Sequence, residues 1–256
     1  MTEPILRISN LTKRFGGVAA VSDVSLQVYP RETLAIIGPN GAGKTTFYNM
    51  LSGRMHPTAG TIVFKGSDIT GLPAHRISRM GVSRSFQINN IFGEMTVREN
   101  VEVALTAYHG DSRRWMNIAS RNKPIQQEAD ALLERLSLTD IAGKRAGFIS
   151  YGDKRLVEIA VVLATRPTLV LLDEPTAGMT PDETQRVTAL VKSLAKTGDY
   201  TFLITEHDMG VVFDVADRIL VMHRGQNLVL GTPQEVKAHP EVRRAYLGDA
   251  EEELAS

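Results

Sequence analysis

The segment that most constrains this chain is Gly38-Pro39-Asn40-Gly41-Ala42-Gly43-Lys44-Thr45, which matches the pattern G-x-x-x-x-G-K-[ST]. An apolar run at Thr33–Ile37 precedes it, and helical apolar spacing follows it at Phe47, Met50 and Leu51. In such a strand-to-helix turn, glycines let backbone N–H groups face inward around phosphate oxygens, where side chains would block the approach. The segment therefore predicts a phosphate-binding loop in an α/β fold.

Three side chains at the end of this loop have predicted roles. We expect Lys44 to reach the β- and γ-phosphates of a nucleotide, the Thr45 hydroxyl to ligate Mg²⁺, and Thr46 to add a phosphate contact. The amino terminus of the following helix adds positive potential at the same place. The loop therefore predicts a nucleotide bound together with Mg²⁺.

Composition excludes several other kinds of chemistry. The chain of 256 residues has no cysteine, which excludes disulfides, thiolate metal sites and a cysteine nucleophile. Its 29 lysines and arginines balance 29 acidic residues, so no overall basic field indicates a nucleic-acid partner. The amino terminus lacks the pattern of a secretory signal, and no apolar run approaches the roughly 20 residues that span a bilayer. We expect a soluble chain that needs a partner to hold it at any membrane.

The order of strands and helices predicts a parallel sheet covered on both faces. Two fully apolar strands, Leu169–Leu172 and Thr201–Ile204, are separated by a helix over Asp182–Lys196. Helical spacing dominates from Arg98 to Leu136, and the polar, basic stretch Asp111–Lys123 interrupts it as an exposed loop in an inserted helical region. Apolar runs predict further strands in the first third of the chain, at Ile5–Ser9, Val24–Val28, Thr33–Ile37 and Thr61–Phe64.

Two carboxylates follow the predicted strand Leu169–Leu172. Asp173 lies where a nucleotide-bound Mg²⁺ is expected at the carboxyl edge of a parallel sheet, and it can hold the ion through water. Glu174 points in another direction and can accept a proton from a water that attacks the γ-phosphate. Acidic residues also end strands simply because the strand has reached solvent. The phosphate-binding loop favours the catalytic interpretation.

His207 follows the other apolar strand, Thr201–Ile204. We expect this strand to be adjacent to the strand of the phosphate-binding loop, which would let His207 contact the γ-phosphate. A lone histidine is more often a surface or core residue, so spacing alone leaves both interpretations open.

Taken in order, these motifs resemble those of the ABC-type ATPases. The phosphate-binding loop and the strand ending in Asp173 and Glu174 correspond to Walker A and Walker B, and Ile149-Ser150-Tyr151-Gly152-Asp153 is similar to the signature Leu-Ser-Gly-Gly-Gln, from which Tyr151 and Asp153 depart. The Ser-Tyr-Gly version resembles the branched-chain, or hydrophobic, amino acid importers. So do four other stretches: Thr205–Met209, Ala216–Ile219, Gly231–Pro233 and Ala245–Gly248.

The resemblance covers nearly the whole chain and implies its domain organisation. We expect one ABC ATPase domain over residues 5–248, with a P-loop NTPase core built on a mainly parallel sheet. An antiparallel β subdomain lies at its amino terminus, and an α-helical subdomain is inserted at roughly residues 88–160. The acidic residues 249–256 form a tail.

The resemblance also implies roles for residues that spacing alone does not single out. Phe15 matches the aromatic residue that stacks on adenine. Gln87 matches the Q-loop glutamine, which contacts Mg²⁺ and the attacking water and links the site to a transmembrane partner. Ser150 and Gly152 would donate hydrogen bonds to the γ-phosphate of ATP held by a second subunit. Thr180 stands where many relatives have the aspartate of the D-loop, so communication across a dimer is expected to differ in detail.

These features together predict the ATP-hydrolysing subunit of an ABC importer for amino acids of the branched-chain type or related small solutes. Its implied partners are a second ABC ATPase subunit, identical or related, and transmembrane permease subunits, with a substrate-binding protein acting indirectly and no nucleic acid. The implied location is the cytoplasmic face of the inner membrane. The resemblance leaves the solute open among branched-chain and other amino acids, amides and urea.

Two other functions are compatible with a phosphate-binding loop. The first is a soluble ABC-type ATPase that remodels a protein complex without a transporter, which co-purification with membranes would distinguish. The second is a GTPase or small-molecule kinase. It is disfavoured because the chain has no Asn-Lys-x-Asp motif and because it gives the signature segment no role.

Overall fold

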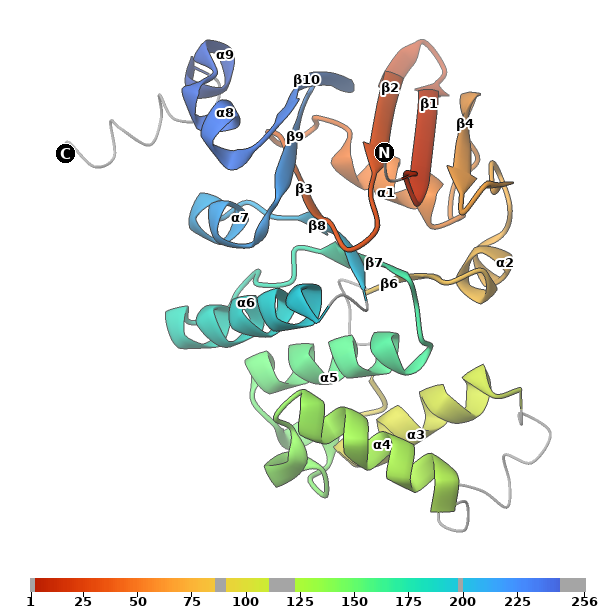
Figure 1. Ribbon diagram of the computed structural model, residues 1–256, viewed down its shortest axis with the longest axis vertical. Coiled ribbons are helices and arrows are strands. Elements are labelled where there is room, and N and C mark those ends of the chain that lie inside the picture. The colour runs from red at the N-terminus through yellow and green to blue at the C-terminus, as the bar shows by residue number, and fades with distance from the viewer. Residues whose placement is uncertain (1–2, 86–90, 111–122, 198–199, 245–256) are drawn as a thin grey trace.

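The computed structural model describes residues 3–85, 91–110, 123–197 and 200–244. The described strands form two sheets, one of six strands in the order β10-β9-β3-β8-β7-β6 and one of four in the order β2-β1-β4-β5 (Figure 1). The predicted α/β class is confirmed.

The six-stranded sheet positions the candidate site. Its strands pair in parallel except for β10 and β9, which pair antiparallel with each other. Successive residues of one strand face different parts of the core: Leu169 and Leu171 pack in one hydrophobic cluster, and Val170 and Leu172 in another. Both faces are therefore covered, which explains the continuous apolar runs in the sequence. The strands are β3 (Thr33–Ile37), β6 (Val82–Arg84), β7 (Leu169–Asp173), β8 (Thr201–Thr205), β9 (Arg218–His223) and β10 (Gln226–Gly231).

The four-stranded sheet is antiparallel throughout and is built from the first third of the chain. Two of its strands extend well beyond the apolar runs that predicted them. The second half of the first strand is mostly polar, and in the second strand Ser22 and Asp23 separate the apolar residues 18–21 from the predicted run Val24–Val28. The strands are β1 (Leu6–Phe15), β2 (Val18–Val28), β4 (Ala59–Phe64) and β5 (Ser67–Asp68). Helix α1 (Lys44–Leu51) joins the two sheets, since its buried Phe47 and Tyr48 belong to the same cluster as Phe64 and Leu203.

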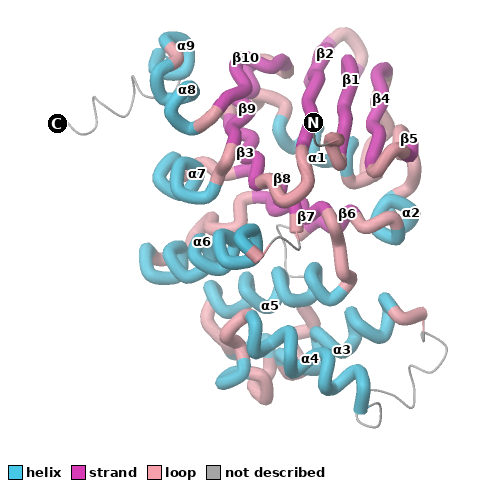
Figure 2. The backbone as a smooth tube through the Cα atoms, in the orientation of Figure 1, coloured by secondary structure: helices cyan, strands magenta, loops and turns pink. Residues whose placement is uncertain are grey.

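Three helices form a separate layer beside the six-stranded sheet. They are α3 (Val97–Tyr108), α4 (Lys123–Arg135) and α5 (Tyr151–Ala164), with short 3-10 turns at Thr139–Ile141 and Ala146–Phe148 between the last two. Figure 2 shows this layer at the end of the molecule opposite the antiparallel strands. Of the predicted loop Asp111–Lys123, residues 111–122 lie outside the described residues, and Lys123 begins α4 instead. The predicted tail at 249–256 also lies outside them.

The remaining helices flank the six-stranded sheet or follow it. Helix α6 (Pro181–Lys196) begins one residue before its predicted start. The short helices are α2 (Ala74–Arg79), α7 (Met209–Val215), α8 (Pro233–Ala238) and α9 (Pro240–Val242). Strands β6, β9 and β10 were not predicted. β6 has only three residues, and no residue of β10 is fully buried.

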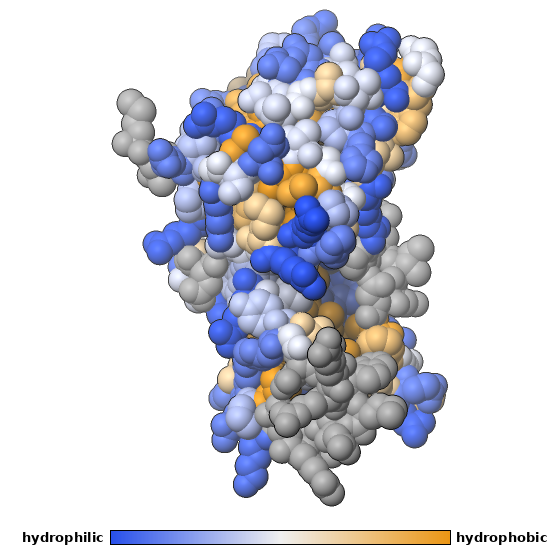
Figure 3. Space-filling model, turned by 90° about the vertical axis from the view of Figure 1, so that its right-hand side faces the viewer, coloured by the Kyte–Doolittle hydropathy of each residue, from blue (hydrophilic) through white to orange (hydrophobic). Residues whose placement is uncertain are grey.

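The surface carries no apolar band on the face seen in Figure 3, where hydrophobic residues lie in small patches among hydrophilic ones. In the described residues, no helix combines the length and the apolar character needed to cross a bilayer.

Candidate functional site

The loop between β3 and α1 has the shape of a phosphate cradle. A Cβ atom on Gly38 would lie 2.3 Å from the Met222 carbonyl oxygen, and one on Gly43 would lie 2.4 Å from the Ala20 carbonyl oxygen. Gly43 also has φ of 99°, in the region that L side chains rarely adopt, and it immediately precedes α1. Close packing and backbone conformation therefore both demand glycine here, and the first N–H groups of α1 face the loop. We call Gly38–Thr46 the P-loop.

Lys44, the first residue of α1, is buried and folds back over the P-loop. Its Nζ donates to the carbonyl oxygens of Gly38 and Pro39. Burial lowers the pKa of this ammonium group, and the negative charges of Glu174 and Asp173 partly oppose that shift. The ammonium is thus held at the mouth of the cradle by carbonyl oxygens that an anionic ligand can replace.

Asp173 ends β7 as a buried carboxylate with both oxygens engaged. Arg84, at the end of the neighbouring β6, donates from Nη2 to Oδ2 at 2.6 Å, and the Thr205 hydroxyl donates to Oδ1 at 2.6 Å. The Arg84 and Asp173 side chains are only 8% and 5% exposed. Arg84 also donates to Asn49 Oδ1 at 2.7 Å, which ties the carboxylate to α1.

Glu174 and His207 come together because their strands are neighbours in the parallel sheet. The register places Asp173 opposite Thr205, so the residues just beyond these strands meet at one edge. His207 Nε2 lies 2.8 Å from Glu174 Oε1. The expected adjacency of the His207 strand to the P-loop strand is also confirmed, because β8 pairs with β3.

The backbone at Glu174 is strained and held from two sides. Its φ is +48°, in the left-handed region that a glutamate seldom occupies. The Glu174 N–H donates to the Thr205 carbonyl oxygen at 3.0 Å, and Arg155 of α5 donates to the Glu174 carbonyl oxygen at 2.8 Å. These bonds aim the carboxylate toward His207 and away from the core.

A buried carboxylate supports the segment after Glu174. Glu206 accepts from both the backbone N–H and the hydroxyl of Thr176, at 2.8 and 2.7 Å. Burial raises the pKa of the Glu206 carboxyl, and the Thr176 hydrogen bonds partly oppose the shift. Glu206 thus connects the loops that follow β7 and β8.

The signature segment lies at the start of α5. The Ser150 hydroxyl caps the helix by accepting from the Asp153 N–H at 3.1 Å. The Gly152 N–H donates to Glu183 Oε1 of α6 at 2.9 Å. In the described part of the chain, the hydrogen-bond partners of Ser150 and Gly152 lie on α5 and α6 and not in the P-loop.

The remaining predicted residues are dispersed. Phe15 ends β1 with 49% of its surface exposed, and Lys13 Nζ lies 5.4 Å from the centre of its ring. Thr45 and Thr46 lie in the first turn of α1, where Thr45 is exposed. Gln87 lies outside the described residues.

A family model described as ABC transporter matches residues 21–177. The chain belongs to the ABC transporter ATPases. A second model, described as branched-chain amino acid ATP-binding cassette transporter, matches residues 227–252. The P-loop NTPase core, the family expected from the motifs and ATP hydrolysis as the enzymatic activity are thereby confirmed.

Curated relatives of this ABC ATPase align over nearly their full length. The high-affinity branched-chain amino acid transport ATP-binding protein LivG of Escherichia coli is 41% identical over 98% of this chain and 100% of its own. BraF of Pseudomonas aeruginosa, described in the same words, is 42% identical over the same shares. Among solved structures, an ATP-binding cassette of an ABC transporter in its ADP conformation has a TM-score of 0.86 at 32% identity, covering 96% of this chain and 100% of that one.

The donor set of this ABC ATPase fits Mg²⁺. Asp173 offers a carboxylate and Thr45 a hydroxyl, which are the hard oxygen ligands that Mg²⁺ takes alongside phosphate oxygens and water. In the described residues, no group of three or more histidines, cysteines or acidic residues forms a metal cluster of its own. The arrangement therefore suits a Mg²⁺ ion that arrives with a nucleotide.

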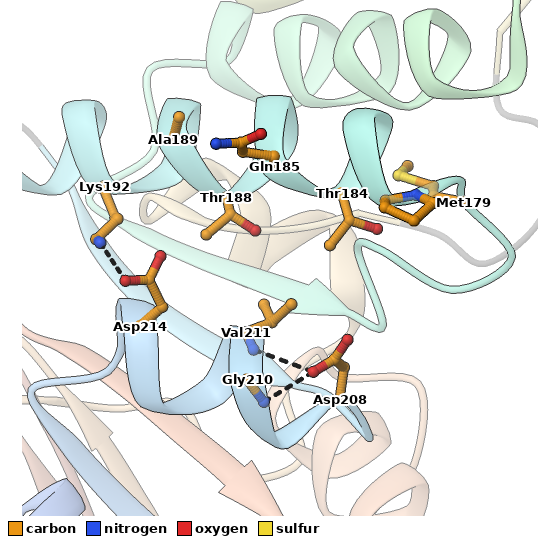
Figure 4. A pocket seen from close by; sticks show the side chains of 11 residues that line it. Met179, Thr184, Gln185, Thr188, Ala189, Lys192, Asp208, Gly210, Val211 and Asp214 are labelled. Atoms are coloured by element: carbon orange, nitrogen blue, oxygen red, sulfur yellow. Dashed lines mark hydrogen bonds and ion pairs between the residues drawn. The ribbon is translucent and has the colours of Figure 1, made fainter.

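A cavity of about 620 Å³ lies apart from the P-loop, between α6 and α7 (Figure 4). Its charged groups are already engaged in its own walls: Lys192 pairs with Asp214, and Asp208 accepts from the N–H groups of Gly210 and Val211. The cavity adds no group to the phosphate site of the ABC ATPase.

Sequence reasoning missed three charged residues that hold this site: Arg84, Arg155 and Glu183. Arg84 gives no local signal, because it lies on the short, unpredicted strand β6, whose register pairs it with Leu171, two residues before Asp173. Glu183 stands three residues after Thr180, which is the spacing of a helix capping box. Arg155 gives no such signal. It pairs locally with Glu158, and its contacts with the site are to the backbone carbonyl oxygens of Glu174 and Pro175 in a distant loop.

Proposed function

We propose that this ABC ATPase energises a membrane importer for amino acids of the branched-chain type or related small solutes. The alignment with LivG and BraF supports this function because it covers 98% of the chain and includes the candidate site. The match of the branched-chain transporter model to residues 227–252 supports it independently, because that segment lies outside the nucleotide motifs.

In this function, the P-loop holds the phosphates of ATP. The segment from Gly38 through Pro39, Asn40, Gly41 and Ala42 to Gly43 surrounds the phosphate oxygens. Its backbone N–H groups, which every one of these residues except Pro39 has, face the phosphates. Phe15 stacks on adenine from the exposed end of β1. Lys44 exchanges its carbonyl partners for β- and γ-phosphate oxygens, and Thr46 adds a phosphate contact. Burial strengthens the attraction between Lys44 and phosphate.

The metal is held by Thr45, Gln87 and Asp173, the last through water. Mg²⁺ supplies neutralisation of charge on the β- and γ-phosphates. The role of Asp173 is to present its carboxylate in one orientation, which the two 2.6 Å bonds from Arg84 and Thr205 enforce.

Glu174 acts as the base that accepts a proton from the attacking water, and His207 contacts the γ-phosphate. One observation carries this proposal: the 2.8 Å contact between Glu174 and His207 lies at the edge of the sheet that also bears Asp173. We assign two roles to His207: its ring orients the Glu174 carboxylate and contacts the transferring phosphoryl group. Gln87 orients the same water.

The second half of the site comes from another ABC ATPase subunit, a copy of this chain or a relative. Ser150 and Gly152 of each subunit donate to the γ-phosphate bound by the other, and the amino terminus of α5 adds positive potential. ATP then closes the dimer, and hydrolysis removes the bridging phosphate and lets it open.

Transmembrane permease subunits receive this motion through the helical region near Gln87 to Val101. Phe92 and Phe148 are exposed there, and the Gly147 N–H bonds the Gly93 carbonyl oxygen at 2.8 Å, which holds their two loops together. The chain would thus work at the cytoplasmic face of the membrane, with a substrate-binding protein acting only through the permease.

A pull-down of the tagged full chain from detergent-solubilised membranes tests this function. We expect mass spectrometry to recover multi-spanning permease subunits and a second ABC ATPase subunit. A Lys44→Ala variant is the matched control, because it loses ATP binding while retaining the exposed surface around Phe92. Recovery of soluble partners alone, with intact ATPase activity, would contradict the importer and favour a soluble ABC ATPase.

A further inference from the structure

Three helices of this chain begin with the same kind of capping box. In each, a threonine hydroxyl accepts from the N–H of a glutamate three residues later, and that glutamate accepts from the threonine N–H. The pairs are Thr96 and Glu99 on α3, Thr180 and Glu183 on α6, and Thr232 and Glu235 on α8. The boxes of α6 and α8 are matched further, because each has proline directly after the threonine.

Glu183 differs from its two counterparts in what it contacts beyond its own helix. Its Oε2 accepts from the N–H and the hydroxyl of Thr180, both at 3.1 Å, as a capping glutamate does. Its Oε1 accepts from the Gly152 N–H of α5 at 2.9 Å. In the described residues, the hydrogen bonds of Glu99 and Glu235 stay within their own boxes. Glu183 therefore bonds a donor that we assign to the γ-phosphate.

The Glu183 side chain also covers that donor. Gly152 is buried, and a Cβ atom built on it would lie 2.6 Å from Glu183 Cγ. Ser150 is exposed and its hydroxyl caps α5. A phosphate oxygen approaching the Gly152 N–H meets the carboxylate first.

Glu183 is held there as an anion. The hydrogen bonds from the Thr180 and Gly152 backbone N–H groups lower the pKa of its carboxyl, so it is ionised at neutral pH. The amino terminus of α5 favours negative charge at the same place. A second link between the two helix starts, from Arg186 to Asp153 at 3.0 Å, keeps them together.

We propose that the Glu183 carboxylate stands in for the γ-phosphate on the signature segment of the unpartnered chain, so that Glu183 is a positioning residue of the ATPase. Two copies of the chain then close around ATP by exchanging one anion for another at the Gly152 N–H. The inference rests on the proposed function, in which Gly152 contacts the nucleotide of the other subunit. The carboxylate leaves by releasing Oε1 alone, while Oε2 keeps capping α6 through Thr180.

The exchange opposes closure in two ways. The Gly152 N–H must give up a charge-assisted hydrogen bond, which is stronger than a neutral one. The displaced carboxylate also repels the incoming phosphate, since both are negative. Both effects weaken when Glu183 becomes glutamine, whose side chain still completes a capping box.

The test compares Glu183→Gln with Glu235→Gln, its matched control on α8. Both are made in the full-length chain that also carries Glu174→Gln, which slows hydrolysis. Sedimentation velocity with Mg²⁺ and increasing ATP gives the ATP concentration at which half of the chain is dimeric. Fluorescent-ATP binding at chain concentrations below dimer formation gives the affinity of the P-loop alone, and circular dichroism checks that both variants are folded.

We expect Glu183→Gln to lower the half-dimer ATP concentration by about tenfold, which is the size of effect that one hydrogen bond per site produces. Glu235→Gln should leave this concentration unchanged. Single-chain ATP affinity should be the same in both. A purely structural role predicts the opposite sign, because a weakened helix cap would loosen the interface. An unchanged or higher concentration for Glu183→Gln, in a chain that does dimerise with ATP, overturns the inference while leaving the proposed function intact. Failure of every variant to dimerise overturns the ATP-bridged pair and this inference with it.

Discussion

The P-loop and the signature segment, which we assign to the same nucleotide, are built in opposite ways. Lys44 and Asp173 are buried at the ends of α1 and β7, and their partners lie on other elements of the same core. Ser150 and Tyr151 are exposed at the start of α5. The first region is organised by the folding of one chain, whereas the second offers donors to something outside it. This difference is the one that our proposed two-subunit site requires.

The largest effect we predict comes from Glu174→Gln, which removes the proposed base from the P-loop side of the nucleotide site. ATP hydrolysis should fall about 10²- to 10⁴-fold, the range for a positioned base, while ATP binding persists. Phosphate release and fluorescent-ATP binding measure the two quantities, with the exposed Glu241→Gln as the control. Hydrolysis near the wild-type rate would show that another group accepts the proton.

The next effect is on stability and comes from Arg84→Met. Asp173 would be left buried without its ion-pair partner, which costs about 3–5 kcal/mol in free energy of unfolding. Urea denaturation measures the loss. The double variant Arg84→Met/Asp173→Asn should regain a large part of it, because no charge then remains buried. Equal losses in the single and double variants would show that the ion pair does not hold this edge of the sheet.

On the exposed side, Ser150→Ala tests the signature segment. Hydrolysis should fall about 10²-fold, the effect of losing one donor to a transition-state oxygen, while ATP affinity of the single chain stays unchanged. Thr96→Ala, which removes the cap of α3 in the same way, controls for the lost helix cap. Equal effects of the two substitutions would mean that Ser150 serves its helix alone.

The smallest effect concerns the pH dependence of the link between the two helix starts. The pKa of the Glu183 carboxyl is lowered from 4.5 in the folded chain, so its ionisation stabilises the fold above that pH. This contribution disappears as the pH falls through the lowered pKa. At pH 7 the melting temperature of the wild type should therefore be slightly higher than that of Glu183→Gln. This difference in melting temperature should disappear as the pH falls below about 4.5. A margin that persists in acid would exclude the carboxylate charge as its cause.

The difference between the P-loop region and the signature segment also determines how much of each could be predicted from the sequence. The P-loop, β7 and β8 combine short local patterns with continuous apolar strands, so their positions and the adjacency of β8 to β3 followed from local spacing and sheet rules. The extent of β1 was underestimated because its second half is mostly polar, and that of β2 because Ser22 and Asp23 interrupt its apolar residues.

The partners of the site residues could not be predicted, because they depend on which elements the fold brings together. Arg84 meets Asp173 across 89 positions of sequence, and Glu183 meets Gly152 across 31. Glu183 in addition performs an ordinary local task, the capping of α6, which conceals its contact with α5 in the sequence. The second role of Glu183 is recognised by comparing its hydrogen bonds with those of Glu99 and Glu235, the glutamates of the other two capping boxes.

The central claim, that the exposed signature segment completes the buried site of a second chain, can be tested by cross-linking. Because the chain has no cysteine, the substitutions Asn40→Cys and Tyr151→Cys introduce the only thiols. In a chain that also carries Glu174→Gln, a mild thiol oxidant such as a copper–phenanthroline complex is added to take up the two electrons lost by each thiol pair. We predict that this oxidant forms a disulfide-linked dimer when Mg²⁺ and ATP are present, and not when ADP replaces ATP. Absence of the dimer with ATP, or its equal formation without nucleotide, would contradict the account.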